Sequence, residues 1–227
     1  RHYSKRFLFL PEVCLEQKGK IFPIPSEKTK HIKKVLRLSN GELVRVTNGK
    51  GYLFEAQIIF RDANVAVEII QQLSLEPEPF CRELFIGLPK NPIMDWIVEK
   101  AVECGVSRIV PVITSRSVVR PQSEDRNRYL NRWNFIMGQA IEQSESLWST
   151  HIEQPQDWSE FINLFSSASQ LEPCLNLVFV SETRQEIEDS AAAKDLWQRL
   201  TDNQSQPVRM FIGPEGGFAA QEVEILK

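Results

Sequence analysis

The sequence predicts a small β-rich domain followed by an α/β domain, whose mostly parallel sheet is covered by helices on both faces. Short apolar runs separated by turn signals fill residues 7–70, which is typical of a small barrel or sandwich. A polar stretch with two prolines, residues 71–80, interrupts this pattern. From Leu84 onward strand-like and helix-like segments alternate, which favours a parallel sheet. We therefore place the first domain at residues 1–73, a linker at 74–81 and the second domain at 82–227.

The first domain contains four apolar runs that indicate strands, Phe7–Leu10, Leu43–Thr47, Leu53–Ile59 and Val65–Ile70. Turns are predicted between them at residues 39–41 and 48–51, where Asn and Gly cluster. One helical turn is expected within Ser26–Leu36, with Ser26 or Thr29 as its cap.

The second domain begins with a predicted buried strand, Leu84–Leu88. Asn91 is expected to cap the next helix with Pro92 in its first turn, and Gly105 to end it. The remaining predicted elements are the strand Val106–Val112, the loop Thr114–Gln122, the helix Asp125–Ser144, the strand Leu175–Val180, the helix Glu186–Leu200, the strand Val208–Ile212 and the helix Ala219–Leu226.

The strongest functional signal follows the last predicted strand. There the apolar run breaks into the loop Gly213-Pro214-Glu215-Gly216-Gly217. Glycines in a strand-to-helix turn let backbone groups approach a ligand closely. Ligands of parallel sheets bind at the carboxyl ends of the strands, where this loop lies. We therefore expect a ligand here, and an ordinary strand-to-helix turn is the alternative.

The charge distribution points to an anionic partner of the first domain. Residues 1–50 hold 12 Lys and Arg against 4 Asp and Glu, a local charge of +8, whereas the whole chain carries −3. A basic region on an acidic remainder favours binding to a phosphate backbone. A solvated basic face without a partner is the alternative.

Cysteine and histidine usage argues against a metal site or a disulfide framework. The four cysteines are far apart in sequence, and the three histidines form no cluster. We expect reduced, mostly buried thiols and no bound metal. No apolar run approaches the roughly 18 residues of a membrane span. These features favour the cytoplasm or an organellar stroma as the location.

Several motifs give the chain a resemblance to one known family. In chain order they are Arg6–Phe9, His31–Arg37 with Gly41, Glu99–Val106, Pro111, Ser115–Ser117, Ala140–Ser144 and Ile212–Phe218. Their order and spacing resemble the RsmE-type 16S rRNA uridine-N3 methyltransferases of the SPOUT (trefoil-knot) superfamily, over essentially the whole chain.

The resemblance implies a PUA-like β-barrel that binds RNA, followed by an α/β-knotted methyltransferase domain. It implies S-adenosylmethionine as the cofactor, a homodimer, and methyl transfer to N3 of one uridine in small-subunit ribosomal RNA. It does not nominate a catalytic base, and none is assigned. Two rival interpretations are a non-catalytic RNA-binding protein of this fold and a SPOUT methyltransferase with another RNA target.

The candidate site residues follow from the motifs and their places. The candidate cofactor contacts are Gly213, Pro214, Glu215, Gly216, Gly217, Val180, Ser181 and Glu182. The candidate RNA contacts are Arg6, Lys33, Lys34, Arg37, Arg116 and Arg120, because guanidinium and ammonium groups bind phosphate.

The sequence departs from the family pattern at three places. The family continues beyond the position of Lys227 with a strand and a Leu/Gly/Arg-rich loop that completes the knot, so we expect this chain to be a shortened form. Glu145 stands where the family usually has a basic residue, which predicts one lost RNA-facing charge. Ala219 stands where Ser or Thr usually caps the helix, a loss of roughly 1 kcal/mol.

Overall fold

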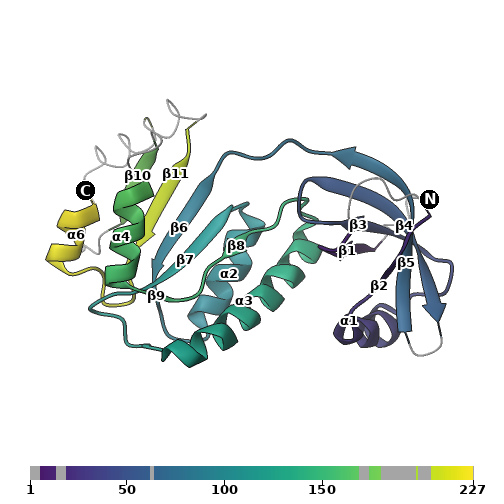
Figure 1. Ribbon diagram of the computed structural model, residues 1–227, viewed down its shortest axis with the longest axis horizontal. Coiled ribbons are helices and arrows are strands. Elements are labelled where there is room, and N and C mark those ends of the chain that lie inside the picture. The colour runs from purple at the N-terminus through teal and green to yellow at the C-terminus, as the bar shows by residue number, and fades with distance from the viewer. Residues whose placement is uncertain are drawn as a thin grey trace. The chain divides into compact units, whose positions relative to one another are not determined.

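A computed structural model of the chain describes residues 6–13, 19–61, 64–168, 174–179, 198 and 206–226, and Figure 1 labels its helices and strands. The chain divides into two compact units. Unit 1 comprises Arg1–Glu78 and Gly138–Ser149, and unit 2 comprises Pro79–Met137 and Thr150–Lys227. No helix in the described part of the chain has the length and apolarity needed to cross a membrane.

Unit 1 is built on one five-stranded sheet. The strand order is β1 (Phe7–Phe9), β3 (Leu43–Thr47), β4 (Tyr52–Arg61), β5 (Asn64–Leu75) and β2 (Ile21–Pro23). The β1–β3 pair is parallel, and the other pairs are antiparallel. Alternate residues of β4, Phe54, Ala56 and Ile58, are buried in the core because successive side chains point to opposite faces of a sheet.

The predicted helical turn is present as α1 (Ser26–His31) followed by the π-helix η1 (Ile32–Leu36). The predicted capping residues are wrong. Pro25 occupies the N-cap position, and no side chain caps the helix. Thr29 lies one turn inside α1, so its hydroxyl donates to the carbonyl oxygen of Pro25 instead.

Two features of unit 1 differ from the sequence prediction. Strand β2 was not predicted; Pro23 stands in it, at the edge of the sheet, where a missing N–H is tolerated. The compact units also differ from the division into 1–73, 74–81 and 82–227, because β5 extends to Leu75 and Gly138–Ser149 joins unit 1. Glu142 explains the second difference: its Oε1 accepts hydrogen bonds from the Phe9 N–H and the Lys28 ammonium.

Unit 2 contains the predicted parallel sheet. Its strand order is β10 (Leu175–Phe179), β11 (Val208–Ile212), β6 (Arg82–Gly87), β7 (Arg108–Ile113) and β8 (His151–Ile152), and β9 (Gln156–Asp157) also pairs with β7. All of these pairs are parallel. The carboxyl ends of β11, β6 and β7 therefore lie side by side at one edge of the sheet.

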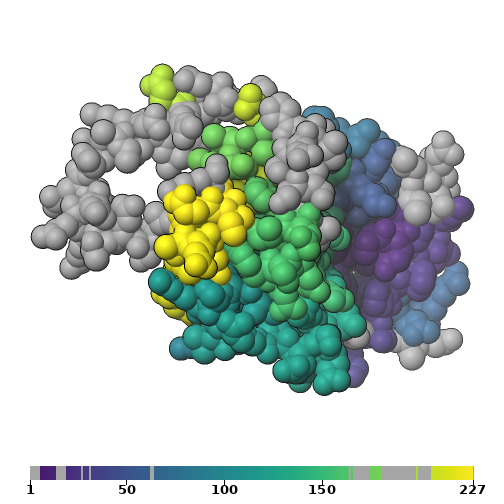
Figure 2. Space-filling view, turned by 60° about the vertical axis from the view of Figure 1, so that its left-hand side comes forward, coloured from purple at the N-terminus to yellow at the C-terminus, as the bar shows by residue number. Residues whose placement is uncertain are grey.

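Helices cover both faces of this sheet, as predicted (Figure 1). On one face, α2 (Ile93–Glu103) and α3 (Ser123–Ser144) pack through Met94, Val98 and Trp133. On the other face lie α4 (Trp158–Ala168) and α6 (Ala220–Leu226). Figure 2 shows α6 in yellow against α4 in green.

Helix α4 was not predicted, although its sequence contains the signal. Trp158, Phe161, Ile162 and Phe165 recur at helical spacing and pack on the sheet. The predicted helix Glu186–Leu200 lies, except for Gln198, outside the described residues.

Two further sequence predictions are wrong. Pro92, not Asn91, occupies the N-cap position of α2, and no side chain caps that helix. Gly105 does end it, with φ of +72°. Cys81 and Cys104 are exposed rather than buried, because both lie at the ends of secondary-structure elements, and Cys14 lies outside the described residues.

Candidate functional site

Three loops meet at the carboxyl edge of the parallel sheet in unit 2. They follow β11 (residues 213–219), β6 (residues 88–92) and β7 (residues 114–122), which are neighbours in the sheet. The sequence prediction pointed to the first of these loops. The structure adds the contacts that fix it to the other two.

The loop after β11 is a closed turn that requires glycine. The Gly217 N–H donates to the Pro214 carbonyl oxygen at 2.7 Å, and Gly217 has a φ of +67°. A Cβ on Gly213 would lie 2.8 Å from the Gly217 carbonyl carbon and 2.8 Å from the Phe218 nitrogen. Any larger residue at position 213 would therefore force the turn open.

A fourth glycine, Gly87, lets this turn rest on the end of β6. A Cβ on Gly87 would lie 2.3 Å from Pro214 Cδ and 2.6 Å from the Pro214 nitrogen. Such contacts do not occur in real structures, so a side chain at position 87 would displace the loop. Sequence reasoning missed this role, because Gly87 reads there as an ordinary strand residue.

Glu215 links the loop after β11 to the loop after β6. Its Oε1 accepts a hydrogen bond from the Lys90 N–H at 2.9 Å. This hydrogen bond lowers the pKa of Glu215 below the ordinary glutamate value, because it favours the ionised carboxylate. The sequence predicts that Glu215 either holds the loop through hydrogen bonds or faces the cationic group of the methyl donor, and this contact supports the first role.

The buried carboxylate of Glu222, in the first turn of α6, links the loops after β11 and β7. Glu222 is 5% exposed. Its Oε1 accepts from the Ser115 N–H at 2.8 Å, and its Oε2 accepts from the Ala219 N–H at 2.7 Å. The second bond compensates for the weak capping residue Ala219, since a glutamate in the first turn reaches back to a backbone N–H before the helix.

Both arginines of the predicted loop after β7 bind backbone carbonyls. Arg116 Nη1 donates to the Gly216 oxygen at 2.9 Å, which adds a second link between these two loops. Arg120 Nη2 donates to the carbonyl oxygens of Thr114 and Ser115, both at 2.8 Å. The guanidinium groups thus hold the loops in place, which does not prevent their remaining N–H groups from meeting phosphate.

Exposed apolar side chains lie beside the glycine loop. Phe179 and Ile212 are paired in register at the ends of β10 and β11, and they are 44% and 36% exposed. Glu215 and Gly216, which follow Ile212 in the same loop, are exposed as well. This edge therefore offers apolar surface, open backbone and an ionised carboxylate. The other predicted cofactor contacts, Val180, Ser181 and Glu182, lie outside the described residues.

The remaining predicted RNA contacts belong to unit 1. Arg6, Lys34 and Arg37 are exposed, and Lys33 is half-buried with its ammonium 5.4 Å from the ring centroid of Phe60. Within the same unit, Glu145 forms an ion pair with Arg45. The glutamate that stands at position 145 in place of the family's basic residue is thus paired with an arginine of β3. Glu145 is exposed.

No group of three or more His, Cys, Asp or Glu side chains that could hold a metal ion is found among the described residues. The polar atoms that converge at the carboxyl edge are backbone groups, carboxylates and guanidinium groups. Such a set suits an organic ligand held by hydrogen bonds.

Comparisons with known proteins identify the family to which this chain belongs. A profile described as the RNA methyltransferase domain matches residues 76–227, and one described as the RNA methyltransferase PUA domain matches residues 24–66. The chain therefore belongs to the RNA methyltransferase domain family, and RNA is the class of its substrate.

Individual relatives extend over almost the whole chain. The Ribosomal RNA small subunit methyltransferase E of Bacillus subtilis is 28% identical over 229 residues, which is 98% of this chain and 84% of the relative. The protein of the same name from Synechocystis is 25% identical over 222 residues, which is 97% of this chain and 67% of the relative.

A solved structure supports the fold. The crystal structure of a Ribosomal RNA small subunit methyltransferase E from Neisseria gonorrhoeae bound to S-adenosyl methionine has a TM-score of 0.75 and 23% identity. It covers 98% of this chain, which covers 85% of it. The predicted fold class, a SPOUT-type α/β methyltransferase domain preceded by a PUA-like domain, is confirmed.

Proposed function

We propose that this RNA methyltransferase transfers a methyl group from S-adenosylmethionine to N3 of one uridine in small-subunit (16S) ribosomal RNA. The observation that carries the proposal is the loop cluster at the carboxyl edge of the unit 2 sheet, where glycine contacts, two carboxylates and Arg116 join three loops. The names of the relatives and their coverage of nearly the whole chain support the same activity.

The residues at this edge fit the methyl donor. Bound there, S-adenosylmethionine would supply an electrophilic methyl group on a positively charged sulfur. Phe179 and Ile212 offer apolar surface to its nucleoside part, and the backbone is exposed at Gly216 and partly exposed at Gly213, whereas Gly217 is buried and closes the turn. The ionised Glu215 favours a cation nearby. We keep the other cofactor contacts predicted from the sequence as part of this proposal, namely Pro214, Val180, Ser181 and Glu182.

Methyl transfer requires mainly that donor and acceptor are held in line and that water is excluded. A turn fixed by Gly87 and Glu222 is suited to this task, because it resists displacement when the ligand binds. Arg116 and Arg120 are proposed to meet the RNA near the reacting base, while Arg6, Lys33, Lys34 and Arg37 are proposed to bind the phosphate backbone.

We further propose that the protein works as a homodimer in the cytoplasm or an organellar stroma, with residues 1–73 as its RNA-binding domain and 82–227 as its methyltransferase domain. The resemblance to the family supports these points. Light scattering coupled to size-exclusion chromatography measures the mass of the particle, and a single-chain mass contradicts the dimer.

The test of the activity combines donor binding with a map of the modified nucleotide. Calorimetric titration measures the affinity for S-adenosylmethionine, and primer extension on treated 16S rRNA detects N3-methyluridine as an arrest, because the methyl group blocks base pairing. Saturable donor binding with one arrest supports the proposal. RNA binding without donor binding indicates a non-catalytic RNA-binding protein, and an arrest in another RNA indicates a different target.

Gly216→Val tests the ligand loop. A Cβ at this position would lie 3.3 Å from Arg116 Cβ and 3.7 Å from both Cδ and the carbonyl oxygen of the same residue. The fold should therefore persist while the valine covers the exposed edge. We expect donor binding to be lost in calorimetry. Gly138→Ala is the control, because its Cβ would lie at an ordinary 3.5 Å from Phe9. Unchanged donor affinity in Gly216→Val would contradict the assignment of the loop.

The RNA-binding role of unit 1 is tested by Lys33→Ala combined with Arg37→Ala. Each lost phosphate contact reduces the dependence of log affinity on log salt, so the slope should fall by about 1.5. Filter binding with 16S rRNA across a salt series measures the slope. If the slope is unaltered, these side chains do not contact phosphate.

A further inference from the structure

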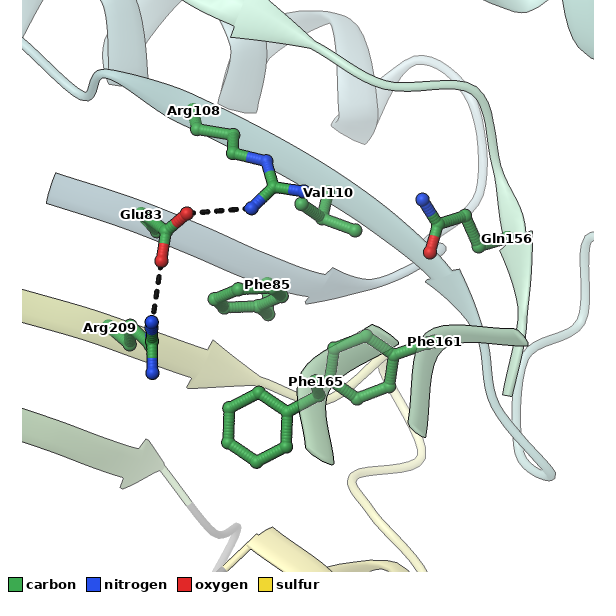
Figure 3. Close-up of a pocket in the computed structure, with 8 residues that line it drawn as sticks. All are labelled: Glu83, Phe85, Arg108, Val110, Gln156, Phe161, Phe165 and Arg209. Carbon is green, nitrogen blue, oxygen red and sulfur yellow. Dashed lines mark hydrogen bonds and ion pairs between the residues drawn. The ribbon is translucent and has the colours of Figure 1, made fainter. Parts of the chain in front are cut away.

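The opposite half of the same sheet contains a cavity of about 140 Å³ on the face that α4 covers (Figure 3). Its charged lining residues, Glu83, Arg108 and Arg209, lie at the amino ends of β6, β7 and β11. Glu83 precedes Gly87 by four residues, roughly 13 Å along an extended strand. The charged end of the cavity is therefore remote from the loop cluster, whereas Gln156, on β9, lies at the level of Val112 and Gly87.

One side of the cavity is aromatic and apolar. Phe85 and Val110 contribute from the sheet, and Phe161 and Phe165 contribute from α4. The rings of Phe161 and Phe165 are stacked, with centroids 5.7 Å apart and an angle of 26° between their planes. Such a surface favours a flat ring as a ligand.

The opposite side of the cavity carries charged side chains, and the guanidinium of Arg209 has N–H groups that are not hydrogen-bonded to any described residue. Glu83 accepts from Arg108 Nη1 and from Arg209 Nε, both at 2.8 Å. The Arg209 side chain is only 11% exposed, and its buried Nη1 has no hydrogen-bond partner. No acceptor for Arg209 Nη2 is found among the described residues either. Leaving buried donors unpaired is unfavourable, so a ligand with an acceptor atom would stabilise this arrangement.

Gln156 adds an acceptor to the same wall. Its amide nitrogen donates to Glu153, whose other oxygen binds Arg108. The hydrogen bond to Glu153 fixes the amide group of Gln156 and so sets the direction of its oxygen. Within the described part of the chain this oxygen receives no hydrogen bond. A ligand that both accepts from Arg209 and donates to Gln156 would use both groups.

The charges decide between an anionic and a neutral ligand. Arg108 and Arg209 are balanced by Glu83 and Glu153, so the cluster has no excess positive charge to compensate a buried anion. The size also limits the ligand, since a cavity of about 150 Å³ holds one benzene ring. A neutral six-membered ring with a carbonyl oxygen and a ring N–H satisfies both conditions.

We propose that this cavity binds one pyrimidine base, with its ring against Phe161 and Phe165, a carbonyl oxygen accepting from Arg209 and a ring N–H donating to the Gln156 amide oxygen. The base belongs either to a nucleotide of the RNA or to a free nucleoside, since the chemistry recognised is the same. The proposal does not depend on methyl transfer or on the methyl donor.

Uridine is the probe for the first experiment, in the absence of S-adenosylmethionine. Saturation-transfer NMR on the whole chain should show transfer to the base protons, and a titration gives the affinity. Arg209→Lys keeps the charge beside Glu83 but loses the planar donor pair, so uridine affinity should fall about tenfold. Arg126→Lys is the matched control, because Arg126 is also a poorly exposed arginine paired with carboxylates and does not line the cavity.

A second pair of variants guards against a folding defect in Arg209→Lys. Gln156→Leu preserves the size of the side chain and removes the amide, so it should also weaken uridine binding, whereas the exposed Gln154→Leu should not. Absence of saturable binding up to the solubility of uridine overturns the proposal. Equal affinity in Arg209→Lys, Gln156→Leu and the unaltered chain does so as well.

Competition with oligouridylate identifies the source of the base. Displacement of uridine, with the same loss in Arg209→Lys, assigns the cavity to a nucleotide of the RNA. Oligouridylate binding without displacement assigns it to a free nucleoside. Either outcome supports a pyrimidine-binding cavity. Both outcomes can be measured even if the chain does not methylate 16S rRNA.

Discussion

The loop cluster and the cavity lie on the same three strands, β6, β7 and β11, and are built in different ways. At the carboxyl ends the chain uses glycine and backbone groups, with Glu215 and Glu222 as links between loops. On the α4 face it uses side chains alone, with Glu83 between two arginines and phenylalanines opposite. A backbone site tolerates no added side chain, whereas a side-chain site responds to the loss of a particular group.

The largest expected effect is that of Gly87→Val on the loop cluster. Its side chain would collide with the backbone of Pro214, which cannot rotate away, so we expect a loss of about 3 kcal/mol in the free energy of unfolding and loss of donor binding. Urea unfolding and calorimetry measure the two. Gly138→Ala is the control, since alanine favours helix there by up to about 1 kcal/mol. A stable Gly87→Val that binds the donor would show that the loop does not depend on this contact.

Glu222→Gln tests whether a carboxylate is needed between the loops. A glutamine offers one acceptor oxygen where Glu222 uses two, and its amide would face a backbone N–H. We expect a loss of about 2 kcal/mol in unfolding free energy and about tenfold in donor affinity. Glu124→Gln, at an exposed glutamate in the first turn of α3, should change neither. Loss of stability with normal donor affinity would make Glu222 a purely structural residue.

Glu83→Gln tests the side-chain cluster through pH. Burial by itself would raise the pKa of Glu83, but the hydrogen bonds and charges of Arg108 and Arg209 outweigh it, so the pKa lies below the ordinary 4.5. The ionised carboxylate therefore stabilises the fold above pH 4.5, and this contribution is lost as the pH falls below 4.5 through the folded-state pKa.

Urea unfolding across a pH series measures this effect. Glu83→Gln should cost about 1.5 kcal/mol at neutral pH and should flatten the decline in stability below pH 4.5. Donor affinity should be unaffected, because the cluster lies away from the loops. An unchanged pH profile would mean that Glu83 does not contribute to acid unfolding, and reduced donor affinity would show that the two regions are coupled.

The smallest expected effect is that of Arg116→Lys. The bond from Arg116 to the Gly216 oxygen is exposed, so the unfolding free energy should change by less than about 1 kcal/mol. Donor affinity should fall about threefold, because the loop keeps its other links. A loss as large as that of Glu222→Gln would assign Arg116 a direct role at the ligand.

Much of the fold could be predicted from the sequence, because the signals for these elements are local. The strand Leu43–Thr47, the alternation after Leu84 and the stop at Gly105 depend on neighbouring residues, and the structure has them. The short strand β2 was missed because its pairing with β5 is not local. Helix α4 was missed although Trp158, Phe161 and Phe165 carry the periodicity.

The sequence by itself determined the glycine turn after β11, because Gly213, Gly216 and Gly217 follow a strand directly and their conformational freedom is a property of the residue type. The ligand proposed for this turn stays a prediction. The tertiary structure decided what holds that loop, since Gly87, Ser115 and Glu222 meet it only once parallel strands stand side by side. It alone also decided the cavity, whose charged and polar residues come from positions 83, 108, 156 and 209. Hydrogen bonds and packing between such distant positions depend on distance in space, and no local pattern of residues encodes that distance.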